Sequence, residues 1–217
     1  MKKRAIVLLW AGIFVVSACA GPGGKTSGAL LEEKFSGSEQ TWTTGTDADS
    51  SVEYAGGGLH MQVFTPNYFV WSMANAVDYS NIHIEVTVKN DGMDGDAAFG
   101  LICHQGASES DQYYLAITSN GQYAIAREAA GQDDVYLTGG DYDYWGVSDL
   151  IPANASSYQL GADCGNGTLA LYVNGQQIAF ASDSTYTSGK VGLFAWSAEM
   201  TAPVDLTFND FIVTPLK

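Results

Sequence analysis

Basic residues are scarce in this sequence. The chain of 217 residues has nine Lys and Arg against twenty-four Asp and Glu, and charged residues of both signs make up only 15% of it. A negative field of this size repels the phosphates of nucleic acids and anionic lipid headgroups, so the composition argues against a nucleic-acid partner. With so few charges, the surface must be covered largely by Gly, Ser, Thr, Asn, Gln and Tyr, which is typical of secreted β-proteins.

The sequence also lacks a helical period and internal repeats. The missing repeats of about 20 to 50 residues argue against a propeller or a solenoid. Instead, roughly ten short strand-like segments recur at intervals of about eight to twelve residues, with turn residues between them. This spacing predicts one all-β domain built as a sandwich or a jelly roll.

No apolar run is long enough to cross a bilayer, but the start of the chain has the features of a signal peptide. Three basic residues at positions 2–4 precede an apolar stretch at 5–16, which is too short to span a membrane. The segment ends in Val16-Ser-Ala-Cys19, which resembles the bacterial lipobox with Val16 in place of the usual Leu. The resemblance implies that Cys19 is lipidated. The alternative is an ordinary secretory signal peptide cleaved nearby, in which Cys19 has no special role. More than one acyl chain on Cys19 would hold the protein at a membrane surface.

Residues 20–29 have no apolar period and are rich in Gly. We therefore expect a flexible tether between the signal peptide of residues 1–19 and a domain of residues 30–217. The absence of Asp directly after Cys19 resembles lipoproteins exported to the outer membrane of bacteria with two membranes. These features predict an extracytoplasmic protein, lipid-anchored to a bacterial membrane at the outer membrane or the cell surface.

Asn-Gly turns give the clearest local signals within the domain. Residues 168–180 alternate apolar and polar side chains around Asn174-Gly175, and Asn120-Gly121 separates the segments 113–118 and 122–127. Such dipeptides are the strongest short-range hairpin signal. Segment 82–89 alternates cleanly and predicts an antiparallel strand with one face in the core. Further strands are expected at 52–54, 59–64, 68–72, 97–104, 158–164, 191–195 and 204–213, with an edge strand at 30–35, an acidic turn at 90–96 and a loop at 139–147.

Three cysteines are present, and two remain if Cys19 carries lipid. Cys103 and Cys164 each end a strand-like run and share the parity of apolar neighbours, so both should point to the core. In an oxidising compartment a disulfide between them is the default expectation. Two free buried thiols are the alternative.

A succession of short motifs covers residues 30–215. In chain order they are Phe99-Gly-Leu-Ile-Cys103, Tyr113-Tyr114, Asn120-Gly-Gln-Tyr123, Leu171-Tyr-Val-Asn-Gly175, Gly189-Lys-Val-Gly-Leu193 and Phe208-Asn-Asp-Phe211. The succession resembles the concanavalin A-like lectin and glucanase superfamily, and within it the laminin-G-like domains grouped as 3-keto-disaccharide hydrolase-like.

This resemblance implies a jelly-roll sandwich of two antiparallel sheets and a disulfide between Cys103 and Cys164. His104 stands where many relatives have Arg, which implies a different specificity if that Arg contacts a ligand. The resemblance says little about activity, because the fold hosts lectins, hydrolases and adhesion modules alike.

The sequence has no recognisable catalytic pair. A retaining glucanase needs two carboxylates about 5 Å apart, yet no strand carries Glu-x-Asp-x-x-Glu or a similar pattern, and Glu85 stands alone on its strand. The Gly-x-Ser-x-Gly elbow is absent as well. We assign no catalytic residue. Hydrolysis of a glycoside such as a 3-keto disaccharide, which the resemblance permits, and a protein-interaction role remain alternatives.

Metal-binding signals are weak. The segment Asn90-Asp-Gly-Met-Asp-Gly-Asp96 offers the oxygen ligands that calcium prefers, but Gly92 and Leu101 occupy EF-hand ligand positions. Laminin-G-like domains sometimes hold calcium at loop ends, so the resemblance allows a structural calcium ion. The three histidines, His60, His83 and His104, lack a paired ligand spacing. We predict no transition-metal centre and no other cofactor.

Binding is the stronger hypothesis. Sugar-binding faces combine flat aromatic rings with a few fixed polar groups. The candidate rings are Trp71, Tyr114, Tyr142, Tyr144, Trp145 and Trp196, and the candidate polar partners are His104, Gln105, Arg127 and Asp133.

Two alternatives stay open for these residues. Trp71 and Trp196 could pack in the core, and Arg127 could pair with Asp133 or Asp134. The rings at positions 142, 144 and 145 lie in an expected loop, where exposed aromatics often contact a ligand. This loop is the strongest candidate for a surface site, and the sequence predicts non-catalytic binding of a glycan or another surface polymer.

Overall fold

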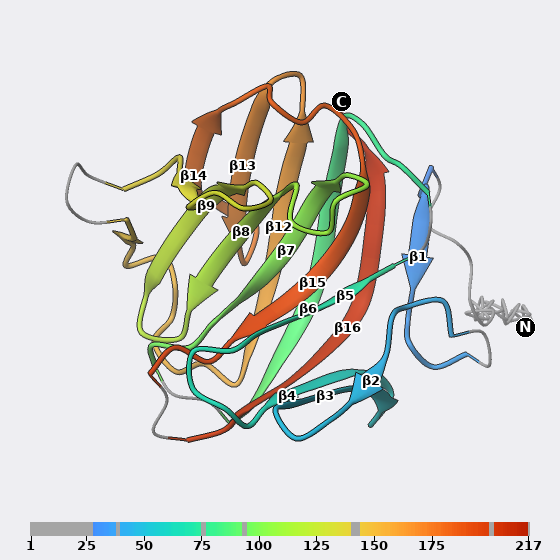
Figure 1. Ribbon diagram of the computed structural model, residues 1–217, viewed down its shortest axis with the longest axis vertical. Helices are drawn as coiled ribbons and strands as arrows, with labels where there is room; N and C mark the ends of the chain where they lie inside the picture. Colours follow the sequence, from blue (N-terminus) through green and yellow to red (C-terminus); the bar gives the residue numbers. More distant parts are fainter. Residues whose placement is uncertain are drawn as a thin grey trace, which may run out of the picture.

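The protein folds into two antiparallel β-sheets packed face to face (Figure 1). The computed structural model describes residues 28–37, 40–74, 77–92, 95–139, 144–199 and 202–216, which contain sixteen β-strands and no helix. The expected lipidation site, Cys19, and the candidate ring Tyr142 lie outside the described residues. Among the described residues, no helix could cross a membrane.

The first sheet has nine strands in the order β14-β13-β12-β6-β16-β4-β3-β2. The short strand β1 pairs with β16 next to β4, on the side opposite β6. The strands are β1 (Leu31–Glu33), β2 (Gly45–Thr46), β3 (Ser50–Ala55), β4 (Gly58–Val63), β6 (Ile82–Gly92), β12 (Ser157–Gly165), β13 (Thr168–Val173), β14 (Gln176–Ser182) and β16 (Val204–Pro215).

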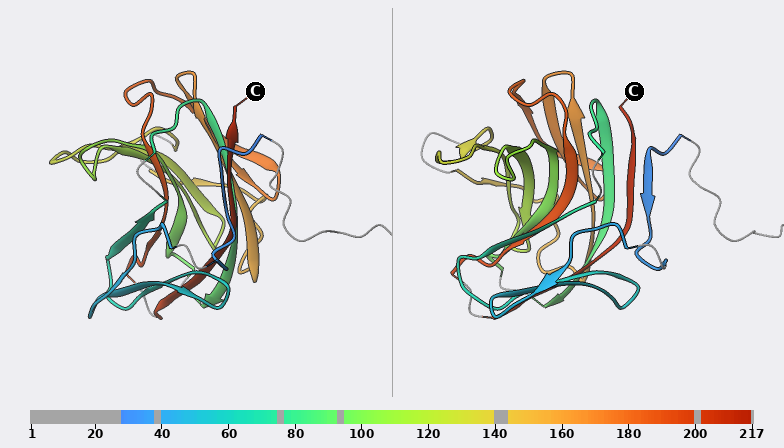
Figure 2. Two further views of the ribbon diagram at one scale, coloured as in Figure 1. Left: turned by 90° about the vertical axis from the view of Figure 1, so that its right-hand side faces the viewer. Right: turned by 45° about the vertical axis from the view of Figure 1, so that its right-hand side comes forward.

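The second sheet has seven strands in the order β10-β9-β8-β7-β15-β5, with β11 also paired to β9. Figure 2 shows the two sheets as separate layers. The strands are β5 (Phe69–Met73), β7 (Ala98–Gln105), β8 (Gln112–Thr118), β9 (Gln122–Glu128), β10 (Val135–Tyr136), β11 (Gly146–Val147) and β15 (Lys190–Trp196).

The alternation of side chains explains which face of each strand is buried. On β6, Ile82, Ile84, Val86 and Val88 are buried, whereas the residues between them are partly exposed, as the pattern predicts. The β13–β14 hairpin turns at Asn174 and Gly175, which have φ of 50° and 77°. Asn and Gly tolerate this left-handed conformation, so the Asn-Gly dipeptide sets the turn.

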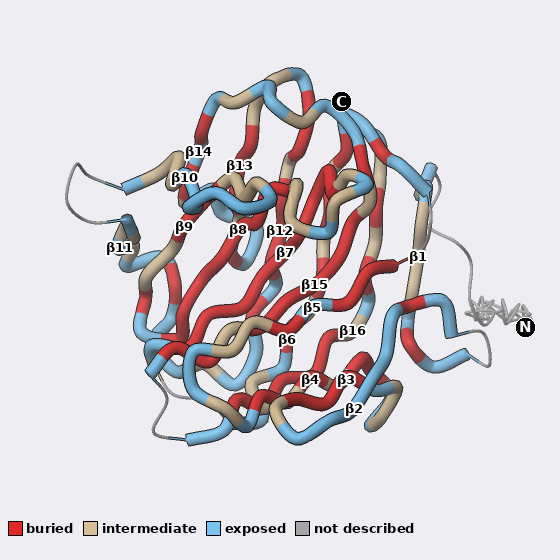
Figure 3. The backbone as a smooth tube through the Cα atoms, viewed as in Figure 1, coloured by how far each residue is buried: buried red, intermediate tan, exposed pale blue. Residues whose placement is uncertain are grey.

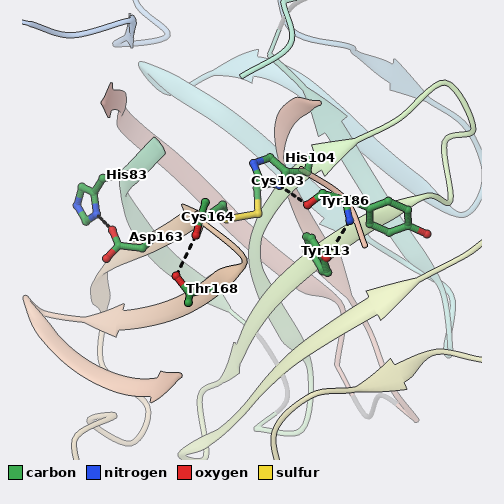
Figure 4. Close-up of a disulfide and its surroundings, with 9 residues drawn as sticks. His83, Cys103, His104, Tyr113, Asp163, Cys164, Thr168 and Tyr186 are labelled. Carbon is green, nitrogen blue, oxygen red and sulfur yellow. Dashed lines mark hydrogen bonds and ion pairs between the residues drawn. A yellow bond between two sulfur atoms is a disulfide. The ribbon is translucent and has the colours of Figure 1, made fainter. Parts of the chain in front are cut away.

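The main core lies between the two sheets, where both contribute fully buried side chains (Figure 3). The predicted disulfide is confirmed: Cys103 on β7 is bonded to Cys164 on β12, with an S–S distance of 2.06 Å (Figure 4). The bond therefore connects the two layers through the core, and the alternative of two free thiols is wrong.

Two expected boundaries are wrong. The acidic turn at 90–96 begins later, because β6 continues to Gly92 by pairing with Asp205 at the start of β16. The expected loop at 139–147 ends in a short strand, since Gly146 and Val147 pair with Tyr123 and Gln122 of β9. In both places the pairing partner lies far away in the sequence, so a local pattern does not reveal it.

Candidate functional site

The outer face of the seven-stranded sheet is apolar. An antiparallel sheet usually presents polar side chains on its solvent side, but here a second buried cluster covers that side. It consists of Met73, Ile102, Tyr114, Ala116, Ala126 and Phe194, with Phe69, Tyr136 and Trp145 packed against it. An apolar solvent-side surface of this kind commonly marks a binding site.

A hollow of about 440 Å³ opens on this face, within the usual range of roughly 300 to 1,000 Å³ for small-molecule pockets. We call it the aromatic pocket. Seven rings line it: Phe69 and Trp71 on β5, Tyr114 on β8, Tyr136 on β10, Trp145 before β11, and Phe194 and Trp196 on β15.

Small residues in the central strands leave room for the pocket. Ala98 and Ala116 line it, and Gly100 pairs with Ala116 on one side and with Phe194 on the other. A Cβ atom at Gly100 would lie 2.0 Å from the backbone oxygen of Leu115 and 3.0 Å from the Phe194 ring. Glycine is therefore required here, and the larger rings stand on the flanking strands.

The rings hold one another in place on both sides of the pocket. Phe69 stacks on Phe194 with ring centroids 4.9 Å apart, and Trp71 lies 6.0 Å from Phe69. On the opposite side, Tyr136 lies 6.5 Å from the Trp145 ring. Trp71 is 37% exposed. The Trp71 indole thus contacts Phe69 and is still exposed enough for a ligand to reach it.

Polar groups border the rings at the β8–β9 side of the pocket. The Tyr114 hydroxyl donates to Asp134 Oδ2 at 2.7 Å, and Gln112 Nε2 donates to Glu128 Oε2 at 2.7 Å. Gln112 itself accepts a hydrogen bond of 2.9 Å from Gln105 Nε2. Glu109 and Ser110 complete the polar lining. Because each carboxylate has two oxygens with several lone pairs, both retain capacity to accept further hydrogen bonds.

Burial affects the titration of two of these groups. It raises the pKa of the Tyr114 hydroxyl far above its usual value, and the neighbouring Tyr136 and Asp134 raise it further. Burial also raises the pKa of the Glu128 carboxyl. The hydrogen bond from Gln112 opposes this shift, and the negative charge of Asp134 adds to it. No Lys, Arg or His side chain among the described residues lines the pocket to balance the negative charge of its carboxylates.

Four of the expected rings come together in this pocket. Trp71, Tyr114, Trp145 and Trp196 lie on separate strands or loops, and sheet pairing places them around one hollow. The alternative that Trp71 and Trp196 pack in the core between the sheets is wrong, because both line the outer pocket. Tyr144 does not line it and is 66% exposed, but its ring packs on Tyr136 at 4.9 Å.

Arg127 is not part of the pocket. It forms an ion pair with Asp183 in the β14–β15 connection and donates to Thr185 Oγ1 at 2.8 Å. The alternative that Arg127 pairs with Asp133 or Asp134 is therefore wrong. Asp133 is exposed and does not line the pocket, whereas its neighbour Asp134 does.

His104 also lies away from the pocket, next to the disulfide (Figure 4). Its side chain is only 2% exposed, and its Nδ1 donates to the backbone oxygen of Tyr186 at 3.1 Å. Burial lowers the pKa of this imidazole. The register of β7 against β15 shifts between Gln105 and Ile102, and His104 has a φ of 54° within this irregularity. A β-bulge breaks the alternation that placed His104 outward. Gln105 is buried too, and its Nε2 donates to two residues that line the pocket, to Gln112 Oε1 and to the backbone oxygen of Glu109, both at 2.9 Å.

Several pocket residues were not expected from the sequence: Phe69, Gln112, Glu128, Asp134, Tyr136 and Phe194. One signal could have found some of them. The run Tyr113-Tyr-Leu-Ala-Ile117 is apolar at consecutive positions, and all seven residues of β8 are buried, so its side chains are covered on both faces of the sheet. A strand that is apolar on both faces predicts that the outer face of its sheet is covered as well. The side chains on that face of the neighbouring strands then become candidates for a binding site.

No metal centre is evident in the part of the chain that the structure describes, since no three His, Cys, Asp or Glu side chains are grouped to hold an ion. The segment considered for calcium, residues 90–96, includes two positions outside the described residues, so the calcium expectation stays a prediction.

Comparisons with known proteins agree with this architecture. No protein-family model matches the sequence, and no curated protein matches it. Among solved structures, the carbohydrate-binding module CBM66 from Bacillus subtilis has a TM-score of 0.60 at 14% identity, over 80% of this chain and 94% of the module. The β-glucanase of Bacillus licheniformis has a TM-score of 0.58 at 15% identity, over 87% of this chain and 99% of the glucanase. A Bacillus subtilis protein of unknown function with a galectin-like fold has a TM-score of 0.62 at 14% identity, over 86% of this chain and 96% of that protein.

These identities are low, so the likeness concerns the fold and not the activity. The two-sheet topology, the motif succession and these structural neighbours agree with one another. The chain has the concanavalin A-like jelly-roll fold, which it shares with carbohydrate-binding modules and glucanases.

Proposed function

We propose that the aromatic pocket binds a glycan without chemically changing it. The observation that carries the proposal is the hollow of about 440 Å³ walled by seven rings on the solvent side of the second sheet. An exposed indole such as Trp71 offers a flat surface to the apolar face of a sugar ring. The fold supports the proposal, because a carbohydrate-binding module has it as well.

The polar lining suits sugar hydroxyls. Asp134 accepts a hydrogen bond from Tyr114 and Glu128 accepts one from Gln112, and the remaining lone pairs of both carboxylates can accept from a ligand. Because Tyr114 and Gln112 hold these carboxylates in place, the acceptors are oriented before a ligand arrives. Orientation in advance lowers the entropic cost of binding.

Calorimetric titration of the full-length protein in mild detergent, after a glycan array has identified a ligand, tests the proposal. Trp145→Ala and Trp71→Ala should each weaken binding about tenfold or more, a loss of roughly 1.4 kcal/mol. Phe180→Ala is the matched control, because Phe180 is an exposed ring on β14 of the other sheet. Equal binding by all three variants would overturn the assignment of the pocket.

A second candidate function rests on one observation. Glu128, whose pKa is raised, and Asp134 are two carboxylates in one aromatic pocket, and glycosidases use such a pair as acid and nucleophile or base. Their existing bonds to Gln112 and Tyr114 fit a binding role better. Release of sugar from a bound oligosaccharide, abolished by Glu128→Gln, would favour hydrolysis. If the protein neither binds nor releases sugar, the result would favour a protein-interaction module.

We also propose that the protein is a bacterial lipoprotein, held outside the cytoplasm by lipid on Cys19. The lipobox-like sequence of residues 16–19 supports this, and so does the disulfide, because such bonds persist in oxidising compartments. Metabolic labelling with a fatty acid should mark the wild-type chain and not Cys19→Ser. A labelled Cys19→Ser chain would contradict the proposed attachment site.

A further inference from the structure

Among the described residues, no ion pair joins a Lys, Arg or His side chain to a carboxylate of the aromatic pocket. Glu109, Glu128 and Asp134 line it, and no Lys, Arg or His does so among the described residues. Glu109 and Asp134 are exposed, whereas Glu128 is only partly exposed, so the cost of an uncompensated negative charge falls mainly on Glu128. A ligand that brings a positive charge would remove this cost.

Three of the four Lys and Arg side chains in the described residues form ion pairs elsewhere. Lys34 pairs with Glu32, Lys89 with Asp91, and Arg127 with Asp183. Lys190 lies in a neighbouring hollow that Glu109 also lines, and it forms no ion pair with the three pocket carboxylates. The charge that can act on a ligand therefore rests mainly on Glu128 and Asp134.

The rings add attraction for the same kind of ligand. The face of an indole or phenol ring carries negative electrostatic potential and attracts ammonium groups, by about 0.5 to 2 kcal/mol depending on desolvation. Trp145 and Tyr136 stand on the same side of the sheet as Glu128 and Asp134, near β9 and β10. A protonated amine in this part of the pocket would meet both ring faces and carboxylates, and its hydrogen bonds to the carboxylates would be charge-assisted.

We propose that the pocket selects glycans that carry a protonated primary amine, over their N-acetylated and uronic-acid counterparts. This inference rests on the proposed glycan binding and adds the chemical class of the ligand. An N-acetyl group removes the positive charge. A uronic acid places a second negative charge beside Glu128 and Asp134, which is unfavourable.

The test compares matched sugars on one protein. Oligosaccharides of glucosamine and galactosamine, their N-acetylated forms and the corresponding uronic-acid forms are titrated into the full-length protein in mild detergent at pH 6 and low salt. The amines should bind at least tenfold more tightly than the acetylated sugars, and the uronic acids should not bind measurably. The advantage of the amines should shrink as salt rises, because salt screens charge interactions.

Matched variants separate the pocket from the overall negative charge of the protein. Glu128→Gln and Asp134→Asn should each remove most of the amine advantage while keeping side-chain shape. Asp149→Asn removes the same charge at an exposed position outside the pocket and should keep the advantage. Near-ultraviolet circular dichroism checks that each variant is folded.

The outcomes distinguish this inference from the proposal beneath it. If acetylated sugars bind as tightly as the amines, with loss in Trp145→Ala, glycan binding holds and amine selection is wrong. If Asp149→Asn reduces the amine advantage as much as Asp134→Asn, the overall charge causes it and the pocket assignment is wrong. If no sugar of the three classes binds but the glycan array gives another ligand whose binding is lost in Trp145→Ala, glycan binding holds and amine selection is wrong. If the array gives no ligand either, both proposals fail.

Discussion

The Tyr114 hydroxyl donates a hydrogen bond of 2.7 Å to Asp134 Oδ2 and so ties strand β8 to the segment that enters β10. The other sheet contains the same kind of bond, from the Tyr172 hydroxyl to Asp163 Oδ2, also at 2.7 Å. One Tyr–Asp pair borders the aromatic pocket, and the other lies on the nine-stranded sheet. The protein therefore supplies its own control for the role of the pocket pair.

Tyr114→Phe should weaken ligand binding about fivefold and lower the free energy of unfolding by about 1 kcal/mol. The ring stays, but Asp134 loses the donor that orients it. Because Asp134 is exposed, water replaces part of the lost bond, and the cost falls to about 1 kcal/mol, below the usual range for a hydrogen bond to a charged group. Calorimetric titration and urea unfolding measure the two effects.

Tyr172→Phe is the matched control. It should cost similar stability, because it removes an equivalent bond to Asp163. Ligand binding should remain at the wild-type level. If both variants weaken binding to the same extent, the effect of Tyr114→Phe comes from general loss of stability and not from the position of Asp134.

Removal of the disulfide should destabilise the whole sandwich. The bond closes a loop with a sequence separation of 61 residues. In the chain-entropy description, this lowers the entropy of the unfolded chain and stabilises the folded state by roughly 4 kcal/mol. Changing Cys103 and Cys164 together to Ala should lower the free energy of unfolding by about this amount. Urea unfolding with and without reductant measures it.

Reductant provides the internal check on this prediction. It should shift the wild-type unfolding midpoint close to that of the double Cys→Ala variant, and it should leave the variant unchanged. An unchanged wild-type midpoint, once thiol titration shows that the bond has been reduced, would show that the disulfide does not stabilise the fold.

Local signals were sufficient for most of the strands. The alternation in β6 and the Asn-Gly turn of the β13–β14 hairpin are properties of neighbouring residues, and both are confirmed. The pairing of Cys103 with Cys164 followed from their parity, number and compartment, together with the family resemblance. The strand and the turn need only a few residues of context, whereas the disulfide needed the cysteine count, the compartment and the resemblance as well.

The composition of the pocket could be predicted only in part, because it depends on strand order. Trp71 on β5 and Tyr136 on β10 belong to opposite edge strands of the second sheet, and only the sheet topology relates them. His104 was misplaced for a different reason. A bulge in β7 turned it from the solvent side toward Tyr186, and nothing in its immediate sequence indicates a bulge.

Gly100→Ala should strongly destabilise the protein. The added Cβ would lie 2.0 Å from the backbone oxygen of Leu115, so β7 and β8 would have to separate. Overpacking against backbone costs roughly 3 kcal/mol or more. Gly45→Ala is the control, because no atom lies within 4 Å of its Cβ position, and it should change the free energy of unfolding by less than about 0.5 kcal/mol. Thermal unfolding measures both variants. Equal unfolding midpoints would contradict the conclusion that β7 must approach β8 closely at Gly100.

Asp183 should contribute stability that disappears in acid. Burial alone would raise the pKa of this carboxyl, but hydrogen bonds from Tyr113 and Thr185 and the charge of Arg127 together lower it. A carboxyl with a lowered folded-state pKa stabilises fully above its unfolded pKa of about 3.9, and the contribution is lost as the pH falls through the folded value.

Asp183→Asn should therefore lower the free energy of unfolding by roughly 2 kcal/mol at neutral pH. The difference from wild type should be constant above about pH 5 and shrink below about pH 4. Urea unfolding measured from pH 2 to 7 checks this, with Asp149→Asn as a control at an exposed site. A difference that does not depend on pH would show that shape, and not ionisation, explains the role of Asp183.

Glu128 should have the opposite effect on stability. Burial raises the pKa of its carboxyl, and the charge of Asp134 adds to the shift although Gln112 opposes it. The folded state therefore holds the proton more tightly than the unfolded state, whose pKa is about 4.3. As the pH rises through this value toward the folded pKa, ionisation of Glu128 lowers the free energy of unfolding.

Glu128→Gln removes this ionisation and keeps an oxygen that can accept from Gln112. The variant should be at least as stable as wild type at neutral pH and equal to it below about pH 4, although it binds the amine sugars less well. Opposite changes in stability and affinity are expected where a site keeps a charge that the fold alone would not favour. Urea unfolding across this pH range measures the first effect. If the variant is less stable than wild type at neutral pH, the Glu128 carboxylate supports the fold, and its place in the pocket then needs no ligand to explain it.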